Sequence, residues 1–161
     1  MILGLSISAF VALHVGISLI GIVTGLVALP LLALGRKART LHIAFLATTL
    51  ATTLTGFLFP LGGITPALVV GAVSTLVLAV AIGAFLRRAG RTYAISATIG
   101  LYLNLFVLVV QSFLKVPALN ALAPAGTEPS FLVAQSLTLA ASVALGIWAF
   151  RRTRPTIAAI I

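Results

Sequence analysis

The side chains that could do chemistry in this chain are few, and most of them are uncharged. The sequence has two histidines, one acidic residue and no cysteine. Cysteine nucleophiles, disulfides and thiolate metal sites are therefore excluded, and proton relays or paired-carboxylate catalysis lack their carboxylates. Two histidines and one glutamate do not make a convincing zinc centre. We expect no catalytic residue, no metal site and no cofactor, and a protein that is not an enzyme.

Polar side chains inside long apolar segments are the remaining candidates. Amides and imidazoles are costly in hydrocarbon unless they are paired, so these side chains should face the interior of a helical bundle. At helical spacing and 1.5 Å per residue, four of them could line one polar track or ligand pocket that descends from the outer surface to mid-membrane: His14, Asn104, Gln111 and Gln135. Ordinary hydrogen bonding between helices is the alternative interpretation of the same residues.

The elements that must position these residues are membrane helices. The chain has 161 residues, of which 61% are hydrophobic and 7% charged, whereas a soluble domain carries about 25% charged residues. About 20 apolar residues span the hydrocarbon core, and five segments reach that length: about 3–34, 42–60, 65–86, 92–115 and 131–150. The predicted fold is all-α, a polytopic transmembrane helical bundle of five spans in a single domain over residues 1–161. The first segment is longer than a span needs, so we expect it to tilt and to leave its first turns among the headgroups.

Basic residues set the predicted orientation. The formal net charge is +9, but the positive residues occur in short bursts between apolar runs, which is a topology signal and not a nucleic-acid-binding face. Nine of the ten Lys and Arg lie on one side: Arg36, Lys37, Arg39, Arg87, Arg88, Arg91, Arg151, Arg152 and Arg154. Because Lys and Arg remain in the cytoplasm, we expect the N-terminus outside and the C-terminus inside.

The long connection at residues 116–130 is the predicted external loop. It contains the single carboxylate, Glu128, and follows Lys115, which is the one basic residue on the outer side. Three prolines prevent the loop from extending either helix far. We expect Glu128 to be solvated or weakly paired with Lys115. If the bundle has a mouth, this loop covers it.

Small residues mark the faces where helices should approach closely. Gly21 and Gly25 form a G-x-x-x-G pair, and Gly71 and Gly83 belong to a stripe of small residues at every fourth position. Both patterns are typical of close helix packing in lipid. The second stripe would face a neighbouring helix or a second subunit. His42 opens the second segment beside a basic loop, and we expect it at the membrane interface.

Three blocks of the chain resemble small uncharacterised integral membrane proteins of proteobacteria: "FLATTLATTLTGFLFP" (45–60), "LYLNLFVLVVQSFLKVPALNALAP" (101–124) and "EPSFLVAQ" (128–135). The likeness covers roughly residues 40–150 and is weaker over the first helix. The resemblance implies a multi-pass protein of the bacterial inner membrane. It transfers no activity and no catalytic residue.

The function that the sequence favours is non-enzymatic. It is an accessory or scaffolding subunit, or a bundle that binds lipid or another apolar ligand. The first alternative is a transporter or oligomeric channel for a small solute, with the polar track as its path. The second is a haem- or quinone-binding redox subunit that uses His14, since His14 and His42 lie too far apart to share one haem within a subunit. Expected partners are membrane lipids and either a second copy or a larger membrane complex, but not nucleic acid.

Overall fold

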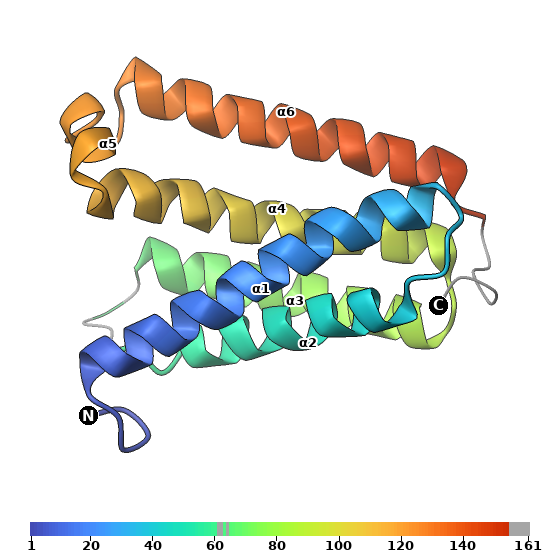
Figure 1. The fold of residues 1–161 in the computed structure, drawn as a ribbon, viewed down its shortest axis with the longest axis horizontal. Coiled ribbons are helices and arrows are strands. Elements are labelled where there is room, and N and C mark those ends of the chain that lie inside the picture. Colours follow the sequence, from blue (N-terminus) through green and yellow to red (C-terminus); the bar gives the residue numbers. More distant parts are fainter. Residues whose placement is uncertain (61–62, 64, 155–161) are drawn as a thin grey trace.

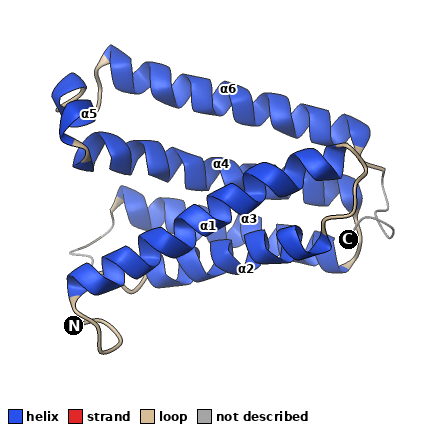
Figure 2. Cartoon of the chain, in the orientation of Figure 1, coloured by secondary structure: helices blue, strands red, loops and turns tan. Residues whose placement is uncertain are grey.

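The computed structural model describes residues 1–60, 63 and 65–154, and over these residues the chain is a bundle of helices without a β-strand (Figures 1 and 2). Its elements are α1 (Ile7–Ala33), α2 (Arg39–Gly56), α3 (Pro66–Leu86), α4 (Gly90–Lys115), α5 (Pro117–Leu122) and α6 (Pro129–Arg152). The predicted all-helical bundle is confirmed. The short α5 lies within the predicted external loop, and the connection at 61–65 falls partly outside the described residues.

Four helices in the described part of the chain are long and apolar enough to cross a membrane: α1, α3, α4 and α6. The protein is therefore a multi-pass helical membrane protein. The fifth expected span corresponds to α2, which is not among the four. This helix has 18 residues, or roughly 27 Å, and it carries several polar side chains: Arg39, Thr40, His42, Thr48, Thr49, Thr52, Thr53 and Thr55.

Local chemistry moves two helix ends away from their predicted positions. The expected start of the first helix at residue 3 is wrong, because Ser6 is the N-cap and its hydroxyl accepts a hydrogen bond from the Ala9 amide at 3.2 Å. Residues 2–5 instead form a tight turn, closed by two backbone hydrogen bonds between Ile2 and Leu5. At the other boundary, α2 ends at Gly56 and not at residue 60. Pro60 disfavours helical backbone at the residue before it and cannot donate to the helix.

The two ends of the bundle differ in charge (Figure 1). At one end lie the α1–α2 connection, the α3–α4 turn and the last turn of α6. These segments carry the nine clustered Lys and Arg residues, so we call this the basic end. The opposite end holds the N-terminus, α5 and Lys115, and we call it the α5 end. The fold therefore brings the three basic bursts of the sequence together.

The apolar core lies towards the basic end and centres on α4, which packs against α1, α3 and α6. Its largest fully buried side chains include Leu29, Leu32, Phe45, Tyr93 and Leu101. In contrast, α6 buries few of its residues inside the chain. Many of the large apolar side chains on the outer faces of the helices are exposed, as expected where lipid replaces water as the solvent.

Candidate functional site

The predicted histidine lies in a polar seam between α1 and α2. His14 Nδ1 is 2.8 Å from Thr55 Oγ1. One helical turn further along α1, Ser18 Oγ is 3.2 Å from Thr52 Oγ1. The contacts advance along α1 while they recede along α2, which is the register of antiparallel helices packed through residues spaced by three or four.

The His14 imidazole joins a small hydrogen-bond network. The Thr55 hydroxyl that it contacts also lies 2.7 Å from the Ala51 carbonyl, one turn back in α2. The imidazole is half-buried and meets the Phe59 ring edge-on, with centroids 5.2 Å apart. His14 thus tethers the two helices near the α5 end.

Two of the predicted packing glycines lie on the same face of α1. A Cβ atom at Gly21 would be 3.0 Å from Thr48 Oγ1. At Gly25 it would be 2.8 Å from the Phe45 ring and 3.0 Å from Leu101 Cδ1. Real Cβ contacts essentially never fall below 3.0 Å. Gly25 therefore marks a point where α1 approaches α2 and α4 so closely that a Cβ atom would force the Phe45 and Leu101 side chains to shift.

The other two predicted packing glycines differ from each other. A Cβ atom at Gly71 would lie 3.1 Å from the Phe57 ring, so Gly71 sits in a close contact at the α5 end of α3. A Cβ atom at Gly83 would meet no atom of the described residues within 4 Å. The sequence left two partners open for this stripe; Gly83 makes no close contact with a helix among the described residues, and contact with a second subunit stays a prediction. Its stripe of small residues turns outward there.

The three predicted amide side chains have different surroundings. Asn104 Nδ2 donates to Thr49 Oγ1 of α2 at 3.2 Å, and Gln135 Nε2 donates to the Phe106 carbonyl of α4 at 3.2 Å. Gln111 is exposed. With the His14 tether, these bonds match the alternative interpretation, hydrogen bonding between helices. A continuous track along all four residues remains a prediction from the sequence.

Glu128 at the α5 end is bound by its own loop. Its Oε1 accepts from the Ala125 amide at 2.8 Å, and its Oε2 accepts from the Thr127 amide at 2.9 Å. The Ala125 amide hydrogen bond is the main reason that the pKa of Glu128 lies below its ordinary value. The sequence predicted a solvated carboxylate or one weakly paired with Lys115; the structure adds that the carboxylate closes a turn immediately before α6.

The rest of the 116–130 connection is folded back on the helices that it joins. Asn120 Nδ2 donates to the Phe113 carbonyl at 3.1 Å, and the Ser130 hydroxyl donates to the Leu122 carbonyl at 2.8 Å. The rings of Phe113 and Phe131 meet edge-on with centroids 5.4 Å apart. The connection is therefore a structured cap on the ends of α4 and α6.

A buried histidine–tyrosine pair near the basic end was not predicted. His42 is 0% exposed because it is buried within the bundle, and its expected depth at the membrane interface stays a prediction. Its Nδ1 lies 2.9 Å from the Tyr93 hydroxyl, while its Nε2 has no hydrogen-bond partner among the described residues. The sequence does hold a signal: both residues lie three positions inside helices that begin at the basic end. His14 and His42 lie towards opposite ends of the bundle, as expected.

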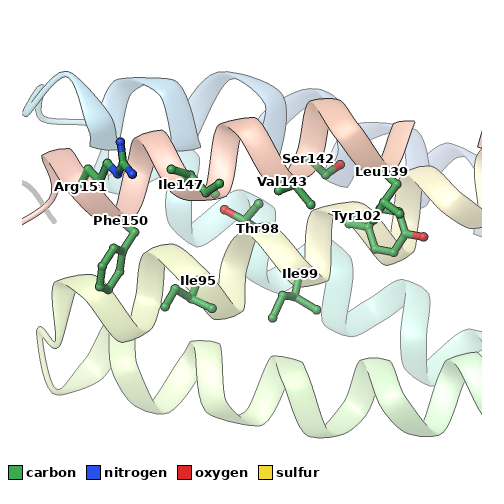
Figure 3. A pocket seen from close by; sticks show the side chains of 11 residues that line it. Ile95, Thr98, Ile99, Tyr102, Leu139, Ser142, Val143, Ile147, Phe150 and Arg151 are labelled. Atoms are coloured by element: carbon green, nitrogen blue, oxygen red, sulfur yellow. The ribbon is translucent and has the colours of Figure 1, made fainter. Parts of the chain in front are cut away.

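A groove of about 550 Å³ runs between α4 and α6 (Figure 3). Most of its lining is aliphatic or aromatic, and Arg151 closes the end nearest the basic end. Figure 3 shows Arg151 and Phe150 at one end of the groove and Tyr102 and Leu139 at the other. The lining residues are Ile95, Thr98, Ile99, Tyr102, Leu139, Ser142, Val143, Gly146, Ile147, Phe150 and Arg151.

Small residues form the floor of this groove. A Cβ atom at Gly146 would lie 3.3 Å from Thr98 Cγ2, so α4 and α6 approach closely there. Thr98 and Ser142 are buried, whereas Val143 and Ile147 stand about half exposed and form a wall. The Thr98 hydroxyl donates to the Ala94 carbonyl at 2.7 Å, which satisfies the polar atom within α4. The groove is therefore apolar along its floor and its wall.

A second groove, of about 340 Å³, lies between α3 and α4. It shares Ile95, Ile99 and Phe150 with the first, so these side chains form the ridge between the two. Arg91 lines the second groove, and its guanidinium carbon lies 5.3 Å from the centroid of the Phe150 ring. Each groove thus has one arginine in its lining. We call the two the α4–α6 groove and the α3–α4 groove.

Comparisons with protein-family models, with curated proteins and with solved structures find no match to this chain. The resemblance to small proteobacterial membrane proteins therefore stays an expectation from the sequence. The fold defines the class, a multi-pass helical membrane protein, and the two grooves are the features from which a function can be argued.

Proposed function

We propose that this chain is a non-enzymatic protein of a bacterial inner membrane that binds lipid, or another elongated apolar ligand, in the α4–α6 groove. The observation that carries the proposal is the shape of that groove. It is open to the surface, has a volume of about 550 Å³, and has a floor of small residues and an aliphatic wall. Such concave, mostly apolar sites between the helices of a bundle are typical ligand sites.

The gain from filling the groove comes from packing and not from the hydrophobic effect. Lipid tails are as apolar as the groove, so moving an acyl chain from bulk lipid into the groove removes little area from water. A chain that fits the floor gains many van der Waals contacts, each of about 0.1–0.2 kcal/mol. A ligand is therefore selected by its shape and by its polar end.

We also propose that α2 is the fifth span and that the basic end faces the cytoplasm. Several threonine hydroxyls of α2 bond to carbonyls one turn back, as Thr48 does with Ala44 and Thr53 with Thr49. Because these groups are satisfied within the helix, α2 can lie at membrane depth between α1 and α3. The concentration of Lys and Arg at one end supports a cytoplasmic C-terminus.

Reporter fusions test this topology. A periplasmic reporter should be active when it is inserted in the 116–130 connection and inactive after Arg154, and a cytoplasmic reporter should give the opposite pattern. The reverse pattern would overturn the orientation, and activity of the same reporter at both positions would mean that α6 does not cross the membrane. A periplasmic reporter inserted at Gly35, in the α1–α2 connection, should be inactive if α2 is a span, and activity there would overturn the fifth span.

Native mass spectrometry of gently extracted protein tests the proposed ligand. Val143 lines the α4–α6 groove and is 51% exposed, so V143W should fill the groove without disturbing the core. We expect wild-type protein to retain bound lipid or another apolar molecule and V143W to lose it. Leu137 lies on the same helix, is 65% exposed and is outside the lining, so L137W is the matched control. Equal retention by wild type and V143W would overturn the proposal.

A further inference from the structure

We infer that the ligand is an anionic two-chain phospholipid whose phosphate lies between Arg91 and Arg151 and whose acyl chains occupy the two grooves. This inference rests on the proposed function and gives it a chemical class. Its starting point is that the grooves are neighbours, separated by a ridge formed by Ile95, Ile99 and Phe150.

The ridge between the grooves is the reason that we infer a ligand with two acyl chains. Ile95 and Ile99 are one turn apart on α4, and both are more than 40% exposed, so they project between the grooves. A single chain fills one groove and leaves the other side of the ridge to bulk lipid. Two chains joined at one headgroup straddle the ridge and lie against both sides of α4. The headgroup then lies where the grooves are closest to the basic residues, beside Phe150.

The length of the α4–α6 groove fits one leaflet. Its lining on α6 runs from Leu139 to Arg151, and at 1.5 Å per residue this is roughly 18 Å. The hydrocarbon core is roughly 30 Å thick, so one leaflet supplies roughly 15 Å of acyl chain. An acyl chain that starts at Arg151 therefore ends near Leu139. The groove is too short for a ligand that spans both leaflets.

The charge at the groove ends selects an anion. Arg151 lines one groove and Arg91 the other, and both are exposed. The single acidic side chain of the sequence, Glu128, lies at the opposite end, so no Asp or Glu side chain competes with a phosphate there. Guanidinium groups bind phosphate oxygens with two parallel hydrogen bonds. Basic pockets between helices on the cytoplasmic side are known to bind anionic headgroups.

Electron spin resonance with spin-labelled lipids tests this inference. The protein is reconstituted in phosphatidylcholine vesicles with a trace of spin-labelled phosphatidylglycerol or, in parallel, spin-labelled phosphatidylcholine. We expect wild type to immobilise the anionic probe with a clear preference over the zwitterionic one. Because these two guanidinium groups line the grooves and can bind the phosphate directly, R91Q/R151Q should lose most of that preference. The charge-conserving variant R91K/R151K should keep a large part of it.

A matched control separates the site from the general positive charge of this end. R87Q/R154Q removes the same charge from the basic end but touches neither groove lining, and it should retain the preference. If R91Q/R151Q and R87Q/R154Q lose the preference for the anionic probe equally, the preference comes from the general positive charge of the basic end, and the inference is overturned. If R91Q/R151Q keeps the wild-type preference, the headgroup position is wrong while the proposed function stands.

The groove-filling variant distinguishes failure of this inference from failure of the proposed function. V143W should lower the immobilised fraction of both probes by the lipid that the groove holds, while lipid around the rest of the bundle stays immobilised, and L137W should not change that fraction. If V143W changes neither probe, the groove does not hold lipid and both proposals fail. If native mass spectrometry shows a dimer free of lipid that V143W dissociates, the grooved face joins two copies of the chain, and the inference is overturned.

Discussion

Nδ1 of His14 and Oγ1 of Thr55 are hydrogen-bonded across the α1–α2 seam, at 2.8 Å. This bond lies towards the α5 end, whereas the largest cluster of buried apolar side chains lies towards the basic end. The bundle is therefore held by two kinds of contact along its length. Apolar packing dominates near the basic end, where the hydrogen-bonded pair His42–Tyr93 is buried as well, and further side-chain hydrogen bonds between helices lie beyond it.

A double-mutant cycle measures the His14 tether. We expect H14L and T55V to show a coupling of about 0.6 kcal/mol, and no more than about 1.7 kcal/mol, because hydrogen bonds between membrane helices are worth that much in such cycles. The readout is the free energy of unfolding of the detergent-solubilised protein. In the matched cycle, T75V replaces a hydroxyl that bonds to the Gly71 carbonyl of its own helix, so its coupling to H14L should be zero. A zero coupling between His14 and Thr55 would mean that the hydrogen bond does not contribute to the free energy of unfolding.

The G-x-x-x-G face of α1 gives the second prediction. In G25A the new Cβ would meet the Phe45 ring at 2.8 Å and Leu101 Cδ1 at 3.0 Å, and overpacking of this kind costs about 1–3 kcal/mol. Gly16 lies on the same helix with no atom of the described residues within 4 Å of its Cβ position. G16A should be neutral or stabilising by up to about 1 kcal/mol through helix propensity. Equal unfolding free energies for the two variants would contradict the close contact at Gly25.

The helices themselves were predictable from the sequence because long apolar runs in lipid have few alternatives. The segment expected at 65–86 is observed at Pro66–Leu86, and that at 92–115 at Gly90–Lys115. The close approach at Gly25 was also predictable, since adjacent small residues on one face leave space that only another helix can fill. These features depend on local composition alone.

The pairings between helices were not predictable, because they depend on register and rotation. Nothing in the sequence says which threonine of α2 accepts from Asn104, and the structure selects Thr49. The α4–α6 groove depends in the same way on Gly146 facing Thr98, two residues far apart in the chain. Ser142 and Gly146 form a visible pair of small residues one turn apart, but the sequence does not show what they face.

The buried pair of His42 and Tyr93 gives the third prediction. Y93F removes the hydroxyl that contacts His42 Nδ1, and because His42 Nε2 has no partner among the described residues, both ring nitrogens are then left unpaired. Such a loss costs about 1–3 kcal/mol. The double variant H42L/Y93F removes the unpaired polar groups and should be less destabilised than the sum of its single variants. Strict additivity in unfolding measurements would contradict a direct bond between the two side chains.

Acidification should loosen the 116–130 connection through Glu128. The amide of Ala125 binds the carboxylate and holds the pKa of Glu128 below its ordinary value of 4.5. A carboxyl with a lowered folded-state pKa stabilises the fold above its unfolded pKa, and that contribution is lost as the pH falls through the lowered value. We expect the hydrogen-exchange protection of the Ala125 and Thr127 amides to be high at neutral pH and to fall in strong acid. In E128Q, which cannot ionise, protection should be lower at neutral pH and should not change over this range. A loss of protection in E128Q as large as that in the wild type would assign the acid sensitivity to another group.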